Sequence, residues 1–460
     1  MSAALPARPP SAPFTSTRNA CKLCEPLGAS LAYRGIAGCI PLIHGSQGCS
    51  TYIRRYCISH FREPLDVASS NFAETAAIFG GRDNLFTALD NVSRSYKPRA
   101  IGISSTCLSE TIGENVPMYL KQYLRERADT APALFYASTP SYRGTHMDGF
   151  HEALFAAVSS LTGSDSAPAE EEPGRRINLI SSLVSTEDLR ELHRILSSFG
   201  APYTLLPDYS ETMDGVSWET YQKLGPGGTE IEDIRKMRGA AGTLYLGHPP
   251  GSDAGRWLEE RHAVPLRHGE LPIGIENNDS FFAALADLAG KETPELWIKE
   301  RGRLIDAYID GHKYLNGKRA LIYGEEDFVC ALASFLDEVG VVPVIAATGA
   351  SGGSFKERVR GALRNTRQPV EIAGDADFVE MLEMARFLKP DFVMGHSKGL
   401  FLSRELGIPL VRCGFPIHDR IGGQRILHLG YRGTLNLFDL LCNSLLAAKQ
   451  DQHDRGYTYL

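Results

Sequence analysis

Short apolar runs alternate with helix-compatible stretches along most of the chain, and this alternation restricts its fold more than any other feature. From about Lys97 onward, each run is followed by a Gly- or Ser-rich turn and then by an amphipathic stretch. The runs lie at residues 98–104, 177–180, 243–247, 319–323, 391–394 and 408–412. Short buried strands that alternate with helices predict parallel sheets built from right-handed βαβ units. We therefore expect an α/β protein.

Residues 318–346 form the clearest such unit. The segment "KRALIYG" has the composition of a strand, "EEDFVCALASFLDEVG" that of an amphipathic helix ending at Gly340, and "VVPVIA" that of the next strand. Glycine commonly follows the last turn of a helix because it adopts left-handed backbone angles without a steric penalty. This unit predicts two parallel strands joined by one helix.

Two seams divide the sequence. Residues 167–176, "APAEEEPGRR", are acidic, contain Pro and Gly and lack apolar periodicity, as linkers do. Residues 300–317 resemble a helix that leads into a new strand. A chain of 460 residues with 43% hydrophobic residues is long enough for several cores. We expect three domains, at residues 1–172, 173–311 and 312–460.

Composition and charge exclude several classes of protein. The formal net charge of −7 gives no concentrated positive charge for nucleic acid. No segment approaches the roughly 18 uncharged apolar residues that a membrane span requires, and residues 1–17 form a Pro/Ala/Ser tail without an apolar signal region. We expect a cytoplasmic protein that binds neither nucleic acid nor membrane, with its nine cysteines mostly as thiols.

Three cysteines lie in turns that suit metal ligation. Cys24 opens "CEPLGAS", Cys49 closes "HGSQGC", and Cys107 closes "AIGISSTC". Their Gly, Ser and Pro neighbours are small, so backbone amides and an inorganic cluster can approach the sulfur closely. From spacing alone, cluster ligation and ordinary packing explain these three residues about equally well.

The remaining cysteines favour other roles. Cys21 forms a Cys-x-x-Cys pair with Cys24, but zinc requires four ligands and the chain has no second close pair. The role of Cys21 stays open. Free cysteine is often a small buried hydrophobe, and apolar or helical surroundings predict that role for five residues. They are Cys39, Cys57, Cys330, Cys413 and Cys442.

Several catalytic motifs are absent from the sequence. There is no G-x-x-x-x-G-K-[ST] loop, so any coupled ATP hydrolysis would occur on another protein. The stretch "GASGGS" at residues 349–354 lacks that pattern and predicts a loop. No local motif indicates Ser/His/Asp catalysis, and we expect no catalytic residue in this chain.

Eight segments resemble, in the same order, the β subunits of nitrogenase component 1, and they span nearly the whole chain. They are "CEPLGASLAYRGIAGCIPLIHGSQGCSTYIRRYCISHFREP", "ASSNFAETAAIFGG", "SSTCLSETIGENV", "TPSYRGTH", "KERGRLIDA", "DFVMGHSKG", "VRCGFPIHDR" and "LGYRGTLNL". The resemblance implies three packed Rossmann-like domains with parallel sheets flanked by helices. It also implies an oxidoreductase subunit.

The resemblance assigns a cofactor. Family β subunits supply three cysteines to an [8Fe-7S] P-cluster shared with the α subunit, and the matching positions are Cys24, Cys49 and Cys107. Ser141, in "TPSYRGTH", matches a serine that can bind a cluster iron on oxidation, although capping of a turn explains it equally well. Cys21 has no counterpart. Three ligands from one chain imply that a partner completes the site.

The resemblance also implies partners and a division of labour. It predicts an α2β2 heterotetramer with an α-type subunit that carries the substrate-reducing cofactor, and an ATP-dependent iron protein that delivers electrons. His44 and Tyr52 are candidates for residues beside the cluster, with ordinary packing as the alternative. The isolated chain should reduce nothing.

Two other classes of protein remain as alternatives. A cofactor-assembly scaffold has a related β-like subunit that lacks the first and third cluster cysteines, whereas Cys24 and Cys107 are both present here. A metal-free binding protein with two α/β lobes would fit the fold but leaves the three cysteine-bearing turns unexplained.

Four departures from the family pattern bear on the substrate. The chain reaches Cys24 near its start, Asn19-Ala20 replaces Asn-Pro, Cys21 is additional, and Glu25 replaces a neutral Gln. An ionised carboxylate beside the cluster would disfavour adding an electron and lower its potential. We therefore expect a diverged branch, the methylthio-alkane reductases that cleave carbon–sulfur bonds, in preference to a nitrogenase that reduces dinitrogen.

Overall fold

The structure, a computed structural model, describes residues 19–127, 131–163, 175–351 and 353–452. The chain divides into two compact units. Unit 1 comprises Met1–Lys22, Glu270–Ala283 and Glu292–Leu460, and unit 2 comprises Leu23–Gly269 and Ala284–Lys291. Unit 2 contains two sheets and unit 1 contains one.

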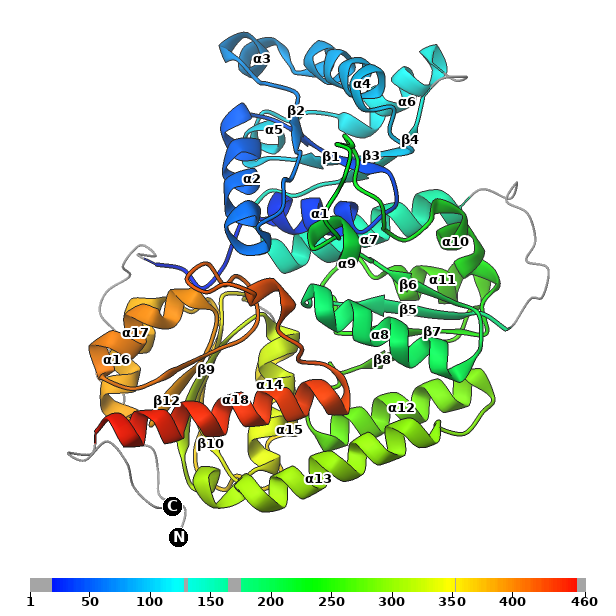
Figure 1. The fold of residues 1–460 in the computed structure, drawn as a ribbon. Coiled ribbons are helices and arrows are strands. Elements are labelled where there is room, and N and C mark those ends of the chain that lie inside the picture. Colours follow the sequence, from blue (N-terminus) through cyan, green and yellow to red (C-terminus); the bar gives the residue numbers. More distant parts are fainter. Residues whose placement is uncertain (1–18, 128–130, 164–174, 352, 453–460) are drawn as a thin grey trace. The chain divides into compact units, whose positions relative to one another are not determined.

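The first sheet of unit 2 is parallel and has the strand order β2-β1-β3-β4 (Figure 1). Its strands are β1 (Cys39–His44), β2 (Ala68–Ser69), β3 (Ala100–Ser105) and β4 (Ala133–Ala137). The helices of this region are α1 (Glu25–Arg34), α2 (Gln47–Phe61), α3 (Glu74–Phe79), α4 (Arg82–Tyr96), α5 (Cys107–Thr111), α6 (Val116–Glu126) and α7 (His146–Thr162). Leu85 and Leu89 of α4 pack with Ile40, Leu42 and Ile103 of the strands.

The second sheet of unit 2 is also parallel, with the strand order β6-β5-β7-β8. Its strands are β5 (Ile177–Ser181), β6 (Tyr203–Leu206), β7 (Gly242–Leu246) and β8 (Leu266–Gly269). The connecting helices are α8 (Thr186–Phe199), α9 (Ser210–Met213), α10 (Ile231–Lys236), the short 3-10 helix η1 (Met237–Gly239) and α11 (Ala254–His262).

Unit 1 contains a five-stranded parallel sheet with the order β11-β10-β9-β12-β13. Its strands are β9 (Arg319–Gly324), β10 (Val342–Thr348), β11 (Glu371–Ala373), β12 (Phe392–Gly395) and β13 (Leu410–Arg412). The helices are α13 (Glu295–Leu315), α14 (Glu326–Glu338), α15 (Phe355–Ala362), α16 (Phe378–Leu388), α17 (Leu400–Leu406) and α18 (Gly430–Asp451), with 3-10 turns η2 (Ser397–Gly399) and η3 (Gly423–Arg425). Helix α12 (Ile275–Ala289) begins in unit 1 and ends in unit 2.

The predicted fold class is confirmed. Each of the six apolar runs overlaps a strand, and the 318–346 unit forms β9, α14 and β10 as expected. Gly340 has a φ of 76° directly after α14, so the left-handed ending is present. The domain boundaries stay predictions, since residue 172 lies outside the described residues and residue 312 lies within α13.

Helices α1 and α7 of unit 2 are in backbone contact (Figure 1). A Cβ atom on Gly28 would lie 1.6 Å from the carbonyl oxygen of His146, and one on Gly149 would lie 2.0 Å from that of Glu25. Real Cβ atoms do not approach other atoms so closely, so each helix needs a glycine where it meets the other. This contact sets the position of the first turn of α1.

The C-terminal end of α1 is held by the segment that follows β6. Arg34 Nη2 donates to the carbonyl of Thr212 at 3.3 Å, and Thr212 Oγ1 donates to the carbonyl of Arg34 at 2.8 Å. Asp208 N donates to the carbonyl of Gly35 at 3.0 Å. Helix α1 is therefore fixed within unit 2 at both ends.

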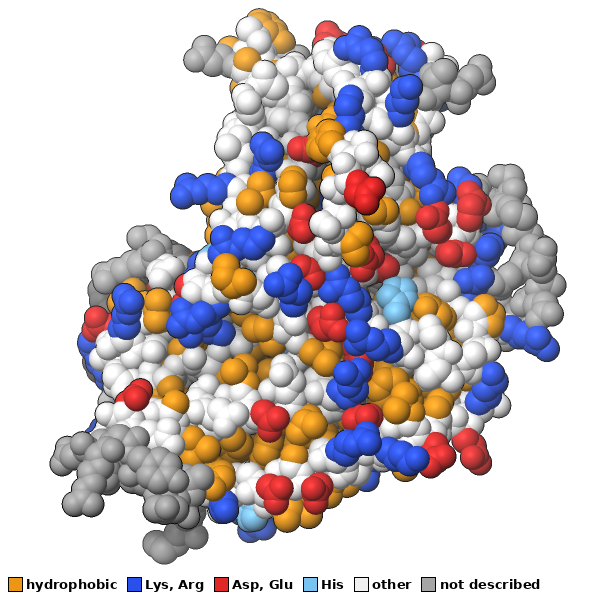
Figure 2. All heavy atoms as spheres, viewed as in Figure 1, with side chains coloured by type: hydrophobic (Ala, Val, Ile, Leu, Met, Phe, Trp, Pro, Cys, Tyr) orange, Lys and Arg blue, Asp and Glu red, His pale blue; other side chains and the backbone are white. Residues whose placement is uncertain are grey.

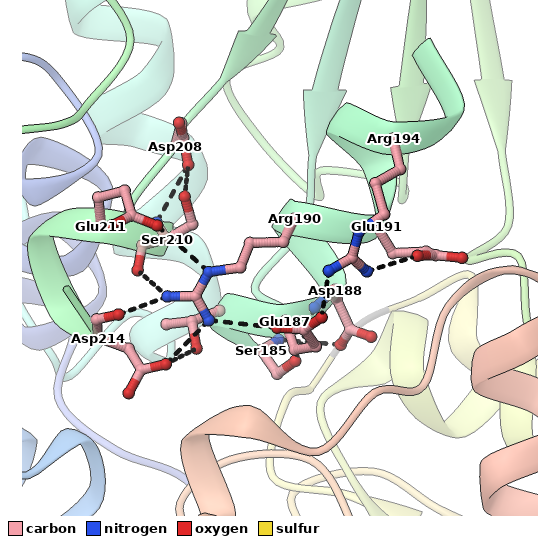
Figure 3. Close-up of polar contacts among 11 residues, drawn as sticks. Ser185, Glu187, Asp188, Arg190, Glu191, Arg194, Asp208, Ser210, Glu211 and Asp214 are labelled. Carbon is pink, nitrogen blue, oxygen red and sulfur yellow. Dashed lines mark hydrogen bonds and ion pairs between the residues drawn. The ribbon is translucent and has the colours of Figure 1, made fainter. Parts of the chain in front are cut away.

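Arg190 of α8 in turn fixes the segment that holds α1 (Figure 3). Its guanidinium donates to the carbonyl of Ser210 at 3.0 Å and to Oδ2 of Asp214 at 2.9 Å, and it pairs with Glu211 at 3.3 Å. These bonds connect α8 to α9 and to the residue that follows it. Because several partners bind the same planar guanidinium group, the position of Arg190 is more rigid than that of a side chain in a single surface ion pair.

We predict that Gly28→Ala separates α1 from α7 and lowers the free energy of unfolding by about 1–3 kcal/mol, because the new methyl group has no room. Urea unfolding of the purified variant measures this. The matched control is Gly302→Ala in α13, where a Cβ atom would meet nothing within 4 Å. That change should be neutral or stabilise by about 0.5–1 kcal/mol. Equal unfolding midpoints for both variants would contradict the close contact.

Candidate functional site

Two of the three candidate cysteines follow adjacent strands of the first sheet. Cys49 lies in the first turn of α2 after β1, and Cys107 is the first residue of α5 after β3. The strands are level, since His44 is paired with Ser105. Because the carboxyl ends of parallel strands meet at one edge of a sheet, these two residues emerge at the same edge.

The other two candidates reach the same edge by different routes. Ser141 follows β4, which pairs with β3 through Ser104 and Ala137. Cys24 is the N-cap residue of α1, and the next amide, Glu25 N, donates to Ser141 Oγ at 3.2 Å. Cys24 follows no strand of the sheet; the packing of α1 on α7 and the bond to Ser141 bring it to this edge.

The electrostatics of Cys49 show that the three sulfur atoms lie near one another. Burial raises the pKa of the Cys49 thiol, and negative charge on Cys24 and Cys107 raises it further. Cys24 and Cys107 are exposed and Cys49 is half-buried, whereas the other six cysteines are buried. The three thiols therefore face outward together.

This arrangement fits half of a shared iron–sulfur cluster. Thiolates are the usual ligands of such clusters, and a cluster completed by a second chain needs its ligands on an accessible surface. Cys24 and Cys107 meet that requirement by exposure. Among the residues that the structure describes, no group of three or more His, Cys, Asp or Glu side chains is placed to hold a single metal ion.

Small residues and caps fix the two cysteine loops against each other. A Cβ atom on Gly45 would lie 2.2 Å from Thr106 Oγ1, so the loop after β1 lies directly on the loop after β3. Thr106 and Ser109 form a capping box at the start of α5, and Ser46 accepts from Gly48 N at 3.2 Å at the start of α2. Each cap satisfies amides that the helix leaves unbonded.

Glu110 is a positioning residue that the sequence analysis missed. It accepts hydrogen bonds from Ser105, from Ser138 Oγ at 2.6 Å and from Tyr136 OH at 3.2 Å, and thereby joins the ends of β3 and β4. Burial raises the pKa of Glu110, but the hydrogen bonds from Ser105 and Ser138 outweigh it and leave the pKa lowered. The only signal in the sequence was its position three residues after Cys107.

The two candidates for residues beside the cluster differ in their surroundings. Tyr52 is 45% exposed, and its ring packs against that of Tyr56 with the centroids 5.5 Å apart. Burial raises its pKa, and negative charge on Cys24 raises it further, so Tyr52 lies near that thiol. His44 is buried and contacts Glu114 Oε2 at 3.2 Å and Ser70 Oγ at 3.1 Å, so its described hydrogen bonds go to these two residues.

Glu25 is buried, with an exposed fraction of 4%. Burial, reinforced by the charge of Asp148, raises the pKa of its carboxyl group to about 8. At neutral pH the group is therefore mostly protonated. The expectation that Glu25 lowers the cluster potential required an ionised carboxylate, and that condition is not met.

The remaining cysteines lie in cores. Cys39, Cys57, Cys330, Cys413 and Cys442 are all buried, which confirms the predicted packing role. Cys21 is buried in the core of unit 1 together with Tyr323 and Phe378. Burial is also the main reason why the pKa of Cys21 is raised. Cys21 belongs to unit 1 and Cys24 to unit 2, and no disulfide joins them.

Comparison with known proteins agrees with the site. The family described as "Nitrogenase component 1 type Oxidoreductase" matches residues 24–446. The chain is 35% identical to the nitrogenase molybdenum-iron protein beta chain of Clostridium pasteurianum over 432 residues, covering 93% of each chain. It is 33% identical to the nitrogenase vanadium-iron protein beta chain of Trichormus variabilis over 446 residues, covering 94% of this chain and 95% of that one.

A solved structure described as "Nitrogenase Cp1 at pH 6.5" matches with a TM-score of 0.93 and 32% identity, over 98% of each chain. The fold and these matches together define an α/β oxidoreductase subunit. The chain belongs to the nitrogenase component 1 type oxidoreductases, and within them it is a nitrogenase-like β subunit. The predicted resemblance is confirmed.

Two further observations concern the charge on the surface and the hydrophobicity of the helices. On the face drawn in Figure 2, Lys and Arg side chains are interspersed with Asp and Glu. None of the described helices has the length and apolar character needed to cross a membrane.

We predict that Glu110→Gln lowers the free energy of unfolding at pH 7 by about 1–2 kcal/mol, because the amide accepts fewer hydrogen bonds than the carboxylate. A carboxyl group whose pKa is lowered by folding contributes stability above its unfolded pKa and loses it as the pH falls. The difference from wild type should therefore shrink as the pH falls below about 4.3, the ordinary pKa of Glu. Unfolding curves at several pH values measure it, and a difference independent of pH would contradict the assignment.

Proposed function

We propose that this chain is the β-type subunit of a nitrogenase component 1 complex that reduces dinitrogen. Cys24, Cys49 and Cys107 bind one half of an [8Fe-7S] P-cluster shared with an α-type subunit. The observation that carries the proposal is the convergence of these three thiols on one accessible edge of the first sheet. When bound, the cluster supplies a site that accepts and donates electrons.

In this proposal, the residues of this chain bind the cluster and orient its ligands. Each cysteine lies at or within the first turn of a helix, where the unbonded amides favour the negative charge of a thiolate. Ser141 lies beside Cys24 through its hydrogen bond with Glu25 N, and we propose it as an oxygen ligand in the oxidised cluster. Gly45 lets the loops of Cys49 and Cys107 contact each other, and Glu110 joins the ends of β3 and β4.

The partners in this proposal are an α-type subunit, in an α2β2 heterotetramer, and an ATP-dependent iron protein. Apolar side chains are exposed next to the ligands, with Leu108 38% and Tyr142 61% exposed. Ile78 and Phe79 on α3 are 74% and 85% exposed, and Figure 2 shows hydrophobic side chains on the surface where α3 lies. Exposed apolar groups of this extent support protein contacts. The cysteines of the described residues form no disulfides, which is compatible with a reducing cytoplasm.

The choice of dinitrogen replaces the expected methylthio-alkane reductase. The molybdenum-iron and vanadium-iron beta chains that this chain resembles are nitrogenase subunits, and their identity extends over more than nine tenths of the chain. The electrostatic argument for a diverged substrate fails because Glu25 is mostly neutral. The scaffold alternative is disfavoured because Cys24 and Cys107 both face the same accessible edge.

We predict that Cys49→Ala and Cys107→Ala each lose cluster iron and weaken association with the α-type subunit, because metal binding stabilises the assembly. Iron analysis and size-exclusion chromatography of the co-purified complex measure both effects. Cys57→Ala and Cys442→Ala are the controls, since both residues are buried away from the site, and they should retain full iron content. Equal iron loss in all four variants would overturn the ligand assignment.

The substrate is tested with the complex reconstituted from this chain, the α-type subunit and the iron protein. We expect ammonia from dinitrogen and no thiol or hydrocarbon from a small methylthio-alkane. The isolated chain with its electron donor should reduce neither. Carbon–sulfur cleavage without ammonia would restore the methylthio-alkane assignment.

A further inference from the structure

Residues 19–22, which we call the anchor segment, are attached to unit 1, although the next residue of the chain belongs to unit 2. Ala20 forms an antiparallel bridge with Asp377. Cys21 N donates to the carbonyl of Ala376 at 2.9 Å, and Phe378 N donates to the carbonyl of Asn19 at 3.0 Å. Backbone hydrogen bonds thus join the anchor segment to the start of α16.

Side chains of unit 1 add further bonds. Asp377 Oδ2 accepts from Asn19 N at 2.6 Å, while its Oδ1 accepts from Val379 N at 2.8 Å and caps α16. Lys398 Nζ donates to the carbonyl of Ala20 at 3.1 Å. Cys21 Sγ lies 3.9 Å from His396 Nε2. The additional cysteine of this chain is therefore an attachment point within unit 1.

The anchor segment lies where sheets of this kind usually bind a ligand. The strand order β11-β10-β9-β12-β13 reverses between β9 and β12, and open α/β sheets bind ligands beyond the carboxyl ends of the strands at that point. His396 and Lys398 follow β12, and Gly349 follows β10. The backbone of the anchor segment thus contacts the carboxyl edge of the sheet in unit 1.

Gly349, which follows β10, accommodates the anchor segment. A Cβ atom on Gly349 would lie 2.0 Å from the carbonyl oxygen of Cys21 and 2.7 Å from Lys22 Cβ. A Cβ atom on Gly353, in the same loop, would meet nothing within 4 Å. Glycine at 349 is therefore needed for contact with the anchor segment, whereas glycine at 353 is not.

Only Leu23 separates the anchor segment from Cys24. Three residues of extended chain span at most about 11 Å, so attachment of Cys21 restricts where the backbone of Cys24 can move. On the other side, the carbonyl of Leu23 accepts from His146 N at 3.0 Å, and Cys24 opens α1. The proposed ligand Cys24 is thus restrained from both directions along the chain.

We propose that the anchor segment is a positioning element that holds the Cys24 thiolate in place and slows loss of the cluster. The proposal rests on the proposed function, because it requires a cluster bound by Cys24. It assigns roles to Cys21, Asp377 and Gly349, none of which is a proposed ligand. Freeing the anchor segment would remove the restraint on the N-terminal side of Cys24, so dissociation of its thiolate would be faster.

The test uses the iron-loaded complex with the α-type subunit. Gly349→Ala pushes the anchor segment away, and Gly353→Ala is the matched control in the same loop. We expect Gly349→Ala to release iron to a ferrous chelator on the order of fivefold faster, as loss of one or two hydrogen bonds would give. Its electron paramagnetic resonance signal should also broaden. Gly353→Ala should match wild type in both measurements.

Asp377→Asn keeps the proposal testable if Gly349→Ala does not fold. Asparagine caps helices as well as aspartate, so its single oxygen can retain the bond to Val379 while its NH2 group opposes Asn19 N. This variant should melt near the wild-type temperature yet release iron as fast as Gly349→Ala. If every folded variant released iron at the wild-type rate, the proposed role of the anchor segment would be wrong and the proposed function would stand. Absence of cluster iron from the wild-type complex would overturn the proposed function as well.

Discussion

The backbone contact between α1 and α7 is the constraint on which the site of this protein depends. Gly28 and Gly149 let the backbones of the two helices contact each other, and this contact fixes the position of α1 along α7. Cys24 lies at the start of α1, and its neighbour Glu25 donates to Ser141. A larger residue at either glycine would therefore displace a proposed cluster ligand as well as a helix.

The other two proposed ligands depend on a different constraint, the alignment of a parallel sheet. Cys49 and Cys107 follow neighbouring strands that pair in register, Gly45 lets the loop after β1 contact Thr106, and Glu110 joins the ends of β3 and β4. The proposed site therefore combines the rigid carboxyl edge of a sheet with the N-terminus of α1. Packing on α7 and hydrogen bonds hold that N-terminus in place. Arg190 belongs to the same support, since it fixes the segment that bonds to Arg34 at the far end of α1.

Solvent exposure separates the cysteines proposed as cluster ligands from the cysteines that pack in the cores. Cysteine is usually buried, and six of the nine here are. The three exposed or half-exposed thiols are the ones proposed to bind the cluster, which is what a site shared between two chains requires. Burial raises the pKa of Glu25, next to Cys24, to about 8, so at neutral pH this carboxyl group is mostly uncharged, as a glutamine would be.

The sequence by itself determined the parallel α/β class and the family, because buried strands, turns and cysteine-bearing motifs are local patterns. It also predicted the core role of five cysteines from their neighbours, and it named three ligand positions that stay proposals. Tertiary structure alone decided the environment of Glu25, the role of Glu110 and the attachment of Cys21. Each of these depends on residues distant in the chain, such as Asp148, Ser138 and His396, that change the burial or hydrogen bonding of the group. No local pattern encodes such contacts.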